Sequence, residues 1–85
     1  MDRKYFTTHR GVAAILLTKG YSIERITSEF DQRKNRQVTK IELDCDVQTG
    51  RGIGDEFFDG KLIVDAKGFY DKMGEVNRAC RDASR

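Results

Sequence analysis

The chain has 85 residues, of which 16 are Lys or Arg and 14 are Asp or Glu, so its formal net charge at pH 7 is +2. A chain of this length predicts a single domain over residues 1–85. Its core is expected to be thin, because a domain of this size buries only roughly 60% of the surface that its unfolded chain exposes. The longest apolar run, residues 12–17, falls far short of the ~18 residues that a membrane helix needs. The N-terminus shows no signal-peptide pattern, so we expect a cytoplasmic protein.

Charge is sorted along the chain. Residues 1–40 contain nine basic and four acidic residues, residues 41–65 contain two and seven, and residues 66–85 contain five and three. The three segments therefore carry net charges of +5, −5 and +2, which add to the +2 of the whole chain. Such segregation favours a surface that attracts a charged partner, and it carries little information about fold.

The first expected element is a helix over residues 9–19. Thr7 or Thr8 can cap its start, because a hydroxyl accepts a hydrogen bond from a free backbone amide there. Gly20 directly after Lys19 is typical of a helix that ends in a left-handed glycine. The apolar residues between these ends recur at helical spacing; they are Val12, Ala13, Ile15, Leu16 and Leu17.

Residues 21–30 and 39–47 are expected to form the two strands of an antiparallel hairpin, joined by the polar segment 31–36. In the first strand the apolar phase slips between Ile23 and Ile26, which indicates a β-bulge or a strand buried partly on both faces. The second strand alternates with a period of two, and its apolar face would carry Thr39, Ile41, Leu43, Cys45 and Val47.

The rest of the chain is expected to hold a short and a long helix. Three glycines within residues 49–54 each disfavour a helix by about 1 kcal/mol, so we expect the short helix only over residues 53–59, closed by Gly60. Residues 62–64 have an extended character and allow a third short strand. Asp65 then caps a long helix with the apolar stripe Ala66, Phe69, Tyr70, Met73, Val76, Cys80 and Ala83.

Together these elements predict an α+β fold. An antiparallel β-hairpin packs against two main helices, and the order along the chain is α-β-β-(α)-α.

The capping and packing residues over about residues 5–80 form a recognisable arrangement. They comprise Phe6-Thr7-Thr8, residues 13–21, the hairpin, Phe57-Phe58-Asp59-Gly60, Val64-Asp65 and Phe69. In this layout the chain resembles a small domain family of unknown function found in phages and bacteria, although the run 50–54 departs from the family's pattern. The resemblance implies a stand-alone accessory protein carried by a mobile element, and it assigns no activity and no catalytic residue.

The residues offer no catalytic or metal-binding signature. The glycines of residues 50–54 match neither nucleotide-binding fingerprint and indicate a flexible connection, or a loop that orders on binding. His9 has no neighbouring carboxylate to orient its ring, so we expect it to be exposed or to cap the helix. Cys45 and Cys80 are expected to be buried and reduced, and with one histidine they do not make a structural zinc site. We therefore expect no enzyme, no cofactor and no metal.

The most suggestive surface is a set of basic residues around the expected hairpin, namely Arg25, Arg33, Lys34, Arg36 and Lys40. Basic hairpins reach phosphates, and two-stranded ribbons fit a major groove, so contact with DNA or RNA is one interpretation. A solvated turn is the ordinary alternative, and contact with an acidic protein is a third. The whole-chain charge of +2 is weak support for nucleic-acid binding.

A second candidate surface is the acidic face of the second strand, formed by Glu42, Asp44 and Asp46. Neighbouring carboxylates repel each other unless cations lie nearby. We expect them to pair across the strands with Arg25 or to be solvated, and a docking surface for a basic partner protein is the alternative.

The sequence therefore favours a non-catalytic accessory protein that binds another macromolecule, in the first place a host or defence protein, through its charge-segregated surface. Nucleic-acid binding through the hairpin tip is the alternative. Four apolar residues exceed what so small a core is expected to bury, and we expect them to support a homodimer; they are Phe57, Phe58, Leu62 and Tyr70.

Overall fold

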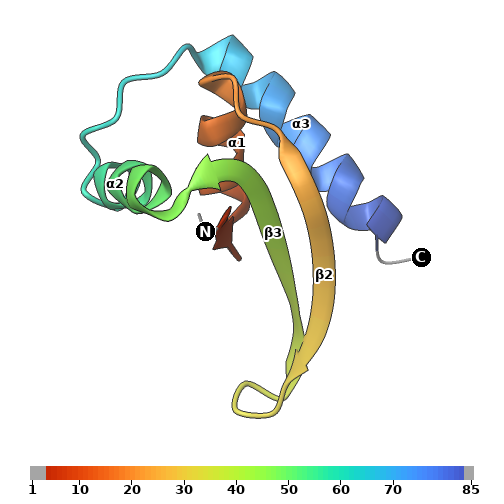
Figure 1. Cartoon of the computed structure of the whole chain (residues 1–85). Helices are drawn as coiled ribbons and strands as arrows, with labels where there is room; N and C mark the ends of the chain where they lie inside the picture. The colour runs from red at the N-terminus through yellow and green to blue at the C-terminus, as the bar shows by residue number, and fades with distance from the viewer. Residues whose placement is uncertain (1–3, 84–85) are drawn as a thin grey trace.

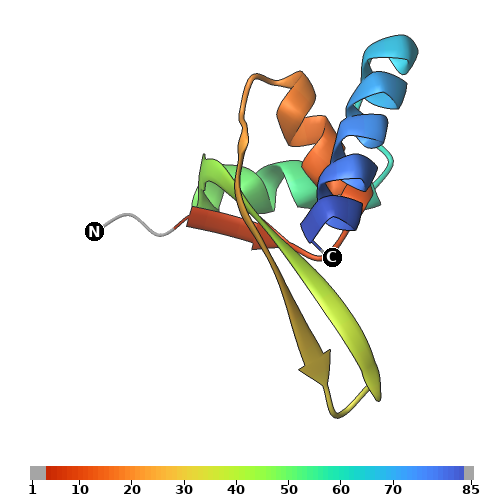
Figure 2. The ribbon, with the colours of Figure 1, turned by 90° about the vertical axis from the view of Figure 1, so that its right-hand side faces the viewer.

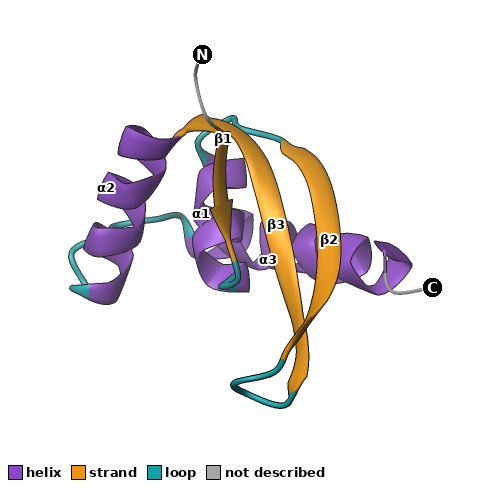
Figure 3. Ribbon diagram, turned by 60° about the horizontal axis from the view of Figure 1, so that its bottom comes forward, coloured by secondary structure: helices purple, strands orange, loops and turns teal. Residues whose placement is uncertain are grey.

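A three-stranded antiparallel sheet and three helices make up the computed structural model, which describes residues 4–83 (Figure 1). The elements are β1 (Lys4–Thr7), α1 (Arg10–Thr18), β2 (Ile23–Asp31), β3 (Arg36–Asp46), α2 (Val47–Phe58) and α3 (Ala66–Ala83). The strand order β1-β3-β2 places the longest strand in the middle. Figure 3 shows α1 and α3 behind one face of the sheet and α2 beside β1, while the other face is open. The predicted α+β class is confirmed.

The third strand lies at the N-terminus and not at the position that the sequence suggested. Residues 62–64 belong to an extended connection between α2 and α3 and have no strand pairing, whereas β1 pairs with β3 through Tyr5↔Leu43 and Thr7↔Ile41. A four-residue strand is too short to show a period of two in its sequence. Its conformation is defined by pairing with β3 and not by its own pattern.

α1 is the most buried element, since every residue from Gly11 to Leu16 is buried. The prediction that Thr7 or Thr8 caps it is wrong: the N-cap is His9, whose Nδ1 accepts a hydrogen bond from the Val12 amide at 3.3 Å. Thr7 still belongs to β1, so the helix starts later, and the Thr7 Oγ1 accepts from the His9 amide at 3.0 Å. Gly20 has a φ of +98°, as predicted for a residue that ends a helix in the left-handed region.

The bulge predicted in the hairpin is confirmed. Ile23 pairs with Leu43 and Arg25 pairs with Glu42, so Glu24 is one extra residue in β2. The extra residue brings both Ile23 and Ile26 onto the face that packs against the core, which explains the slip in the apolar phase. β3 alternates as expected, with Ile41, Leu43 and Cys45 buried.

The glycine-rich segment is helical over its whole length. α2 begins at Val47, six residues before the predicted start, so Val47 is a helical residue and not the end of a strand, and the expected flexible connection is wrong. Asp46 caps the helix, because its side chain accepts a hydrogen bond from the Thr49 amide at 2.9 Å. Gly50 and Gly54 are buried, and Gly50 lies directly against the ring of Tyr5 in β1. Tertiary packing thus overrides the low helix propensity of the glycines.

α3 begins as predicted, with the Asp65 Oδ2 accepting from the Gly68 amide at 2.8 Å. Val76 and Cys80 are buried, and Phe69 and Met73 pack against the core. The apolar stripe is narrower than predicted. Tyr70 is 78% exposed, and Ala66 and Ala83 at the two ends of the helix are exposed as well.

Two glycines of α2 should respond to alanine in opposite directions. A Cβ at Gly50 would overlap the Tyr5 ring, so Gly50→Ala should lower the free energy of unfolding by about 1–3 kcal/mol. A Cβ at Gly52 meets no atom within 4 Å, so Gly52→Ala should raise it by about 0.5–1 kcal/mol through helix propensity. Urea denaturation of the two variants measures both changes. Equal effects of the two substitutions would contradict the packing of Gly50 on Tyr5.

Candidate binding surface

The hairpin of β2 and β3 projects well beyond the helices and ends in a turn (Figures 1 and 2). The Asp31 Oδ1 accepts hydrogen bonds from the backbone amides of Arg33 and Lys34 at 2.9 and 3.3 Å, which fixes the first half of the turn. Asn35 adopts a positive φ of 52° before β3 begins at Arg36, a conformation that asparagine tolerates better than most residues. The turn therefore has a defined shape.

Three predicted basic residues, Arg33, Lys34 and Arg36, lie at this tip and are exposed. None of them has an ion pair within residues 4–83. Asp31 lies opposite Arg36 in the strand register, but its Oδ1 is engaged by the turn amides. Residues 31–36 carry three cations and the carboxylate of Asp31, so the tip keeps a net positive charge of +2.

The other two predicted basic residues are engaged further along the sheet. Arg25 donates from Nε and Nη2 to the Glu42 Oε2 at 3.3 and 3.0 Å. Lys40 lies 3.2 Å from the Glu29 carboxylate and 5.2 Å above the ring of Phe6. The five predicted residues thus divide into an unpaired tip and two paired positions on the open face of the sheet.

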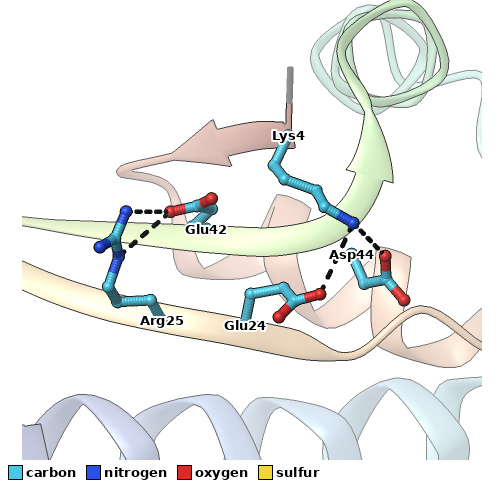
Figure 4. A network of polar contacts seen from close by, with 5 residues as sticks. All are labelled: Lys4, Glu24, Arg25, Glu42 and Asp44. Atoms are coloured by element: carbon cyan, nitrogen blue, oxygen red, sulfur yellow. Dashed lines mark hydrogen bonds and ion pairs between the residues drawn. The ribbon is translucent and has the colours of Figure 1, made fainter. Parts of the chain in front are cut away.

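Two carboxylates of the acidic face, Glu42 and Asp44, have ion-pair partners on the sheet (Figure 4). Glu42 pairs with Arg25, as the sequence suggested. The Lys4 ammonium lies 2.6 Å from Asp44 and 3.6 Å from Glu24, and the hydrogen bond to Asp44 raises the pKa of Lys4 above its ordinary value. Lys4 was not among the predicted site residues, because only the unpredicted pairing of β1 brings it to this face.

Asp46 has a different role from its neighbours on the strand. Its carboxylate caps α2, and the backbone amide of Thr49 holds the pKa of this carboxyl below its ordinary value of 3.8. The three predicted acidic residues are therefore distributed between two cross-strand ion pairs and one helix cap.

The groups considered for catalysis have structural roles. The His9 ring makes edge contacts with Phe57 and Phe58 at centroid distances of 5.0 and 5.1 Å, in addition to capping α1. Cys45 and Cys80 are buried and not joined in a disulfide, as predicted. Burial raises the pKa of the Cys45 thiol, which disfavours the nucleophilic thiolate.

Within residues 4–83, no cluster of three or more His, Cys, Asp or Glu residues is arranged to hold a metal ion. In the same range no helix combines the length and apolar character needed to cross a bilayer. Comparison of the chain with protein-family models, curated proteins and solved structures finds no match. The resemblance to a phage and bacterial domain family therefore stays an interpretation of the sequence.

The Asp46 cap predicts a specific acid sensitivity. Because its folded pKa lies below the unfolded value, ionised Asp46 stabilises the fold above about pH 4, and this stabilisation is lost as the pH falls through the folded pKa. Asp46→Asn keeps a capping side chain without a titrating charge. The Tm difference between native chain and variant should therefore shrink between pH 7 and pH 2 in thermal unfolding. A constant difference would contradict the charged cap.

Proposed function

We propose that this chain is a non-catalytic binding domain that contacts nucleic acid, and duplex DNA in particular, through the tip of its β2-β3 hairpin. The supporting observation is that Arg33, Lys34 and Arg36 have no ion pair within residues 4–83 and lie at the end of a projecting ribbon. Unpaired cations attract phosphates without first breaking an internal salt bridge.

The geometry favours nucleic acid over a basic protein partner. A basic partner would have to compete with Arg25 for Glu42 and with Lys4 for Asp44, and it would have to remove the cap of α2 to reach Asp46. The acidic face is thus less available than the tip. A host or defence protein that binds through this acidic face is therefore less favoured than a partner that binds at the tip.

The form of the hairpin favours a duplex. The major groove of B-DNA is about 12 Å wide and admits a two-stranded ribbon, whereas the major groove of A-form RNA is too narrow for one. Two arginines and a lysine at the end of such a ribbon reach backbone phosphates on either side of the groove, and each arginine can donate two parallel hydrogen bonds to one phosphate.

Fluorescence anisotropy with a labelled duplex tests this proposal. If the three tip cations contact two or three phosphates between them, the affinity should fall about 10- to 40-fold between ~50 and ~200 mM salt. The paired substitution Arg33→Gln and Arg36→Gln should reduce the affinity and flatten this dependence, because each removed phosphate contact lowers the salt slope by about 1.

A matched control removes the same charge elsewhere. Lys61→Gln with Lys67→Gln changes two exposed lysines outside the hairpin and should leave both affinity and salt slope nearly unchanged. Equal losses in the two double variants would indicate attraction by overall charge alone and would sink the proposal, as would an absence of duplex binding by the native chain.

We further propose that the chain forms a homodimer through exposed apolar side chains at the end of α2, in the connection 59–65 and at the start of α3. Phe58 is 67% exposed, Ile63 is 95% exposed and Tyr70 is 78% exposed, with Val64 beside Ile63 in the connecting segment. Among the predicted patch residues, Phe57 and Leu62 are half-buried instead. Such a group of large apolar side chains is a favourable surface for self-association.

Light scattering with increasing protein concentration tests the dimer. Ile63→Lys places a charge at a residue that is 95% exposed, so it should leave the monomer folded, as circular dichroism can check, and shift the chain to a monomer. Gln48→Lys, on an exposed position at the other end of α2, is the control and should stay dimeric. A monomeric native chain at high concentration would contradict this proposal.

A further inference from the structure

A small polar depression lies between the hairpin and the start of α1. It has a volume of about 200 Å³ and is lined by Thr8, Arg10, Lys34, Arg36, Gln37, Val38 and Thr39. A water molecule takes about 30 Å³ in the liquid, so the depression has room for several waters or for one phosphate group. It joins two segments that are more than twenty residues apart in the sequence.

The strand register explains why this depression forms. β1 pairs only with the part of β3 from Ile41 to Asp46, so residues 36–40 have no strand partner on that edge among residues 4–83. The chain leaves β1 at Thr7, caps α1 with His9 and so carries Arg10 past this unpaired edge. Lys34 and Arg36 approach the same space from the turn.

The lining has the chemistry of an anion site. Three basic residues and two threonines line it, and no acidic residue does. A larger depression on the hairpin, of about 500 Å³, is lined by Lys40 and Arg33 but also by Glu29 and Asp31, so its charge is mixed. The smaller depression differs in that its basic residues lie beside neutral polar residues and no acidic residue lines it.

Arg10 is held in position by the fold. Its Nη1 donates a hydrogen bond to the Asn77 Oδ1 of α3 at 2.8 Å. A guanidinium has five N–H donors, so this bond leaves others available, and Arg10 has no ion pair within residues 4–83. An arginine fixed at one end loses less side-chain entropy on binding than a free one.

From these observations we infer that the depression between α1 and the hairpin binds one phosphate of the nucleic-acid backbone, held by Arg10, Lys34 and Arg36. This inference rests on the proposed function and adds to it a residue outside the hairpin. One phosphate seated there fixes the register of the ribbon on the duplex, since phosphate contacts position a protein along the backbone.

Substitution of Arg10 separates the inference from the proposed function. Arg10→Gln should weaken duplex binding about tenfold, the loss expected for a hydrogen bond to a charged group, and Arg10→Lys should recover part of it by restoring the charge. Asn77→Ala should weaken binding less than Arg10→Gln, because it frees the guanidinium without removing it. Arg51→Gln, on an exposed arginine of α2, is the matched control and should bind as the native chain does.

Inorganic phosphate provides a readout that does not depend on DNA. In ¹H–¹⁵N NMR spectra, phosphate at constant ionic strength should shift the amides of Thr8, Arg10, Gln37 and Thr39 saturably, and Arg10→Gln should abolish these shifts. Shifts spread evenly over the surface, or matched by chloride, would overturn the inference.

The possible outcomes are distinct. If the native chain binds duplex and Arg33→Gln with Arg36→Gln weakens it while Arg10→Gln does not, the phosphate position is wrong and the proposed function stands. If the native chain binds no duplex, the proposed function fails and the inference fails with it.

Discussion

The burial of one face of β3 against the helices determines that the charged residues along this strand lie on the opposite, open face of the sheet. Ile41 and Leu43 are fully buried, and a strand alternates its side chains between two faces, so Lys40, Glu42 and Asp44 must lie on the open face. A slip of one residue would place these charges in the core. The bulge at Glu24 has the same effect on β2. Ile23 and Ile26 are three positions apart and would lie on opposite faces of a regular strand, but the extra residue brings both to the buried face.

Because of this arrangement, the basic and acidic segments of the sequence do not form separate surfaces of the folded chain. Along the sequence, a basic segment precedes an acidic one, but antiparallel pairing places them side by side. Arg25 meets Glu42 and Lys4 meets Asp44, so much of the apparent segregation is neutralised within the sheet. A positive excess persists at the end of the hairpin, where Arg33, Lys34 and Arg36 outnumber the single carboxylate of Asp31.

The sequence predicted the elements whose signal is local, and it missed those that depend on distant contacts. The stripe of α1, the alternation of β3, the bulge and the Asp65 cap are all visible within a few residues. β1 is not visible in this way, because it has only four residues and its conformation depends on pairing with β3. The full length of α2 is not visible either, because its glycines disfavour a helix and only the structure shows that Gly50 packs against the Tyr5 ring. For the same reason Arg10 was missed as a candidate binding residue: its position beside Lys34 and Arg36 follows from the place where β1 ends.

The small net charge of the chain does not argue against phosphate binding at the tip. Arg36 and Asp44 are eight residues apart on β3, which corresponds to roughly 26 Å along a strand. The Debye length is only about 8 Å at physiological ionic strength, so a phosphate at the tip experiences Arg10, Lys34 and Arg36, together with the Asp31 carboxylate of the same turn. It hardly experiences the paired carboxylates at the other end of the sheet. Attraction at distances longer than this is largely screened, so the charge near the contact governs binding. A domain with a charge of +2 can therefore present a strongly basic contact surface, provided that its cations are left unpaired, as those of the hairpin tip are.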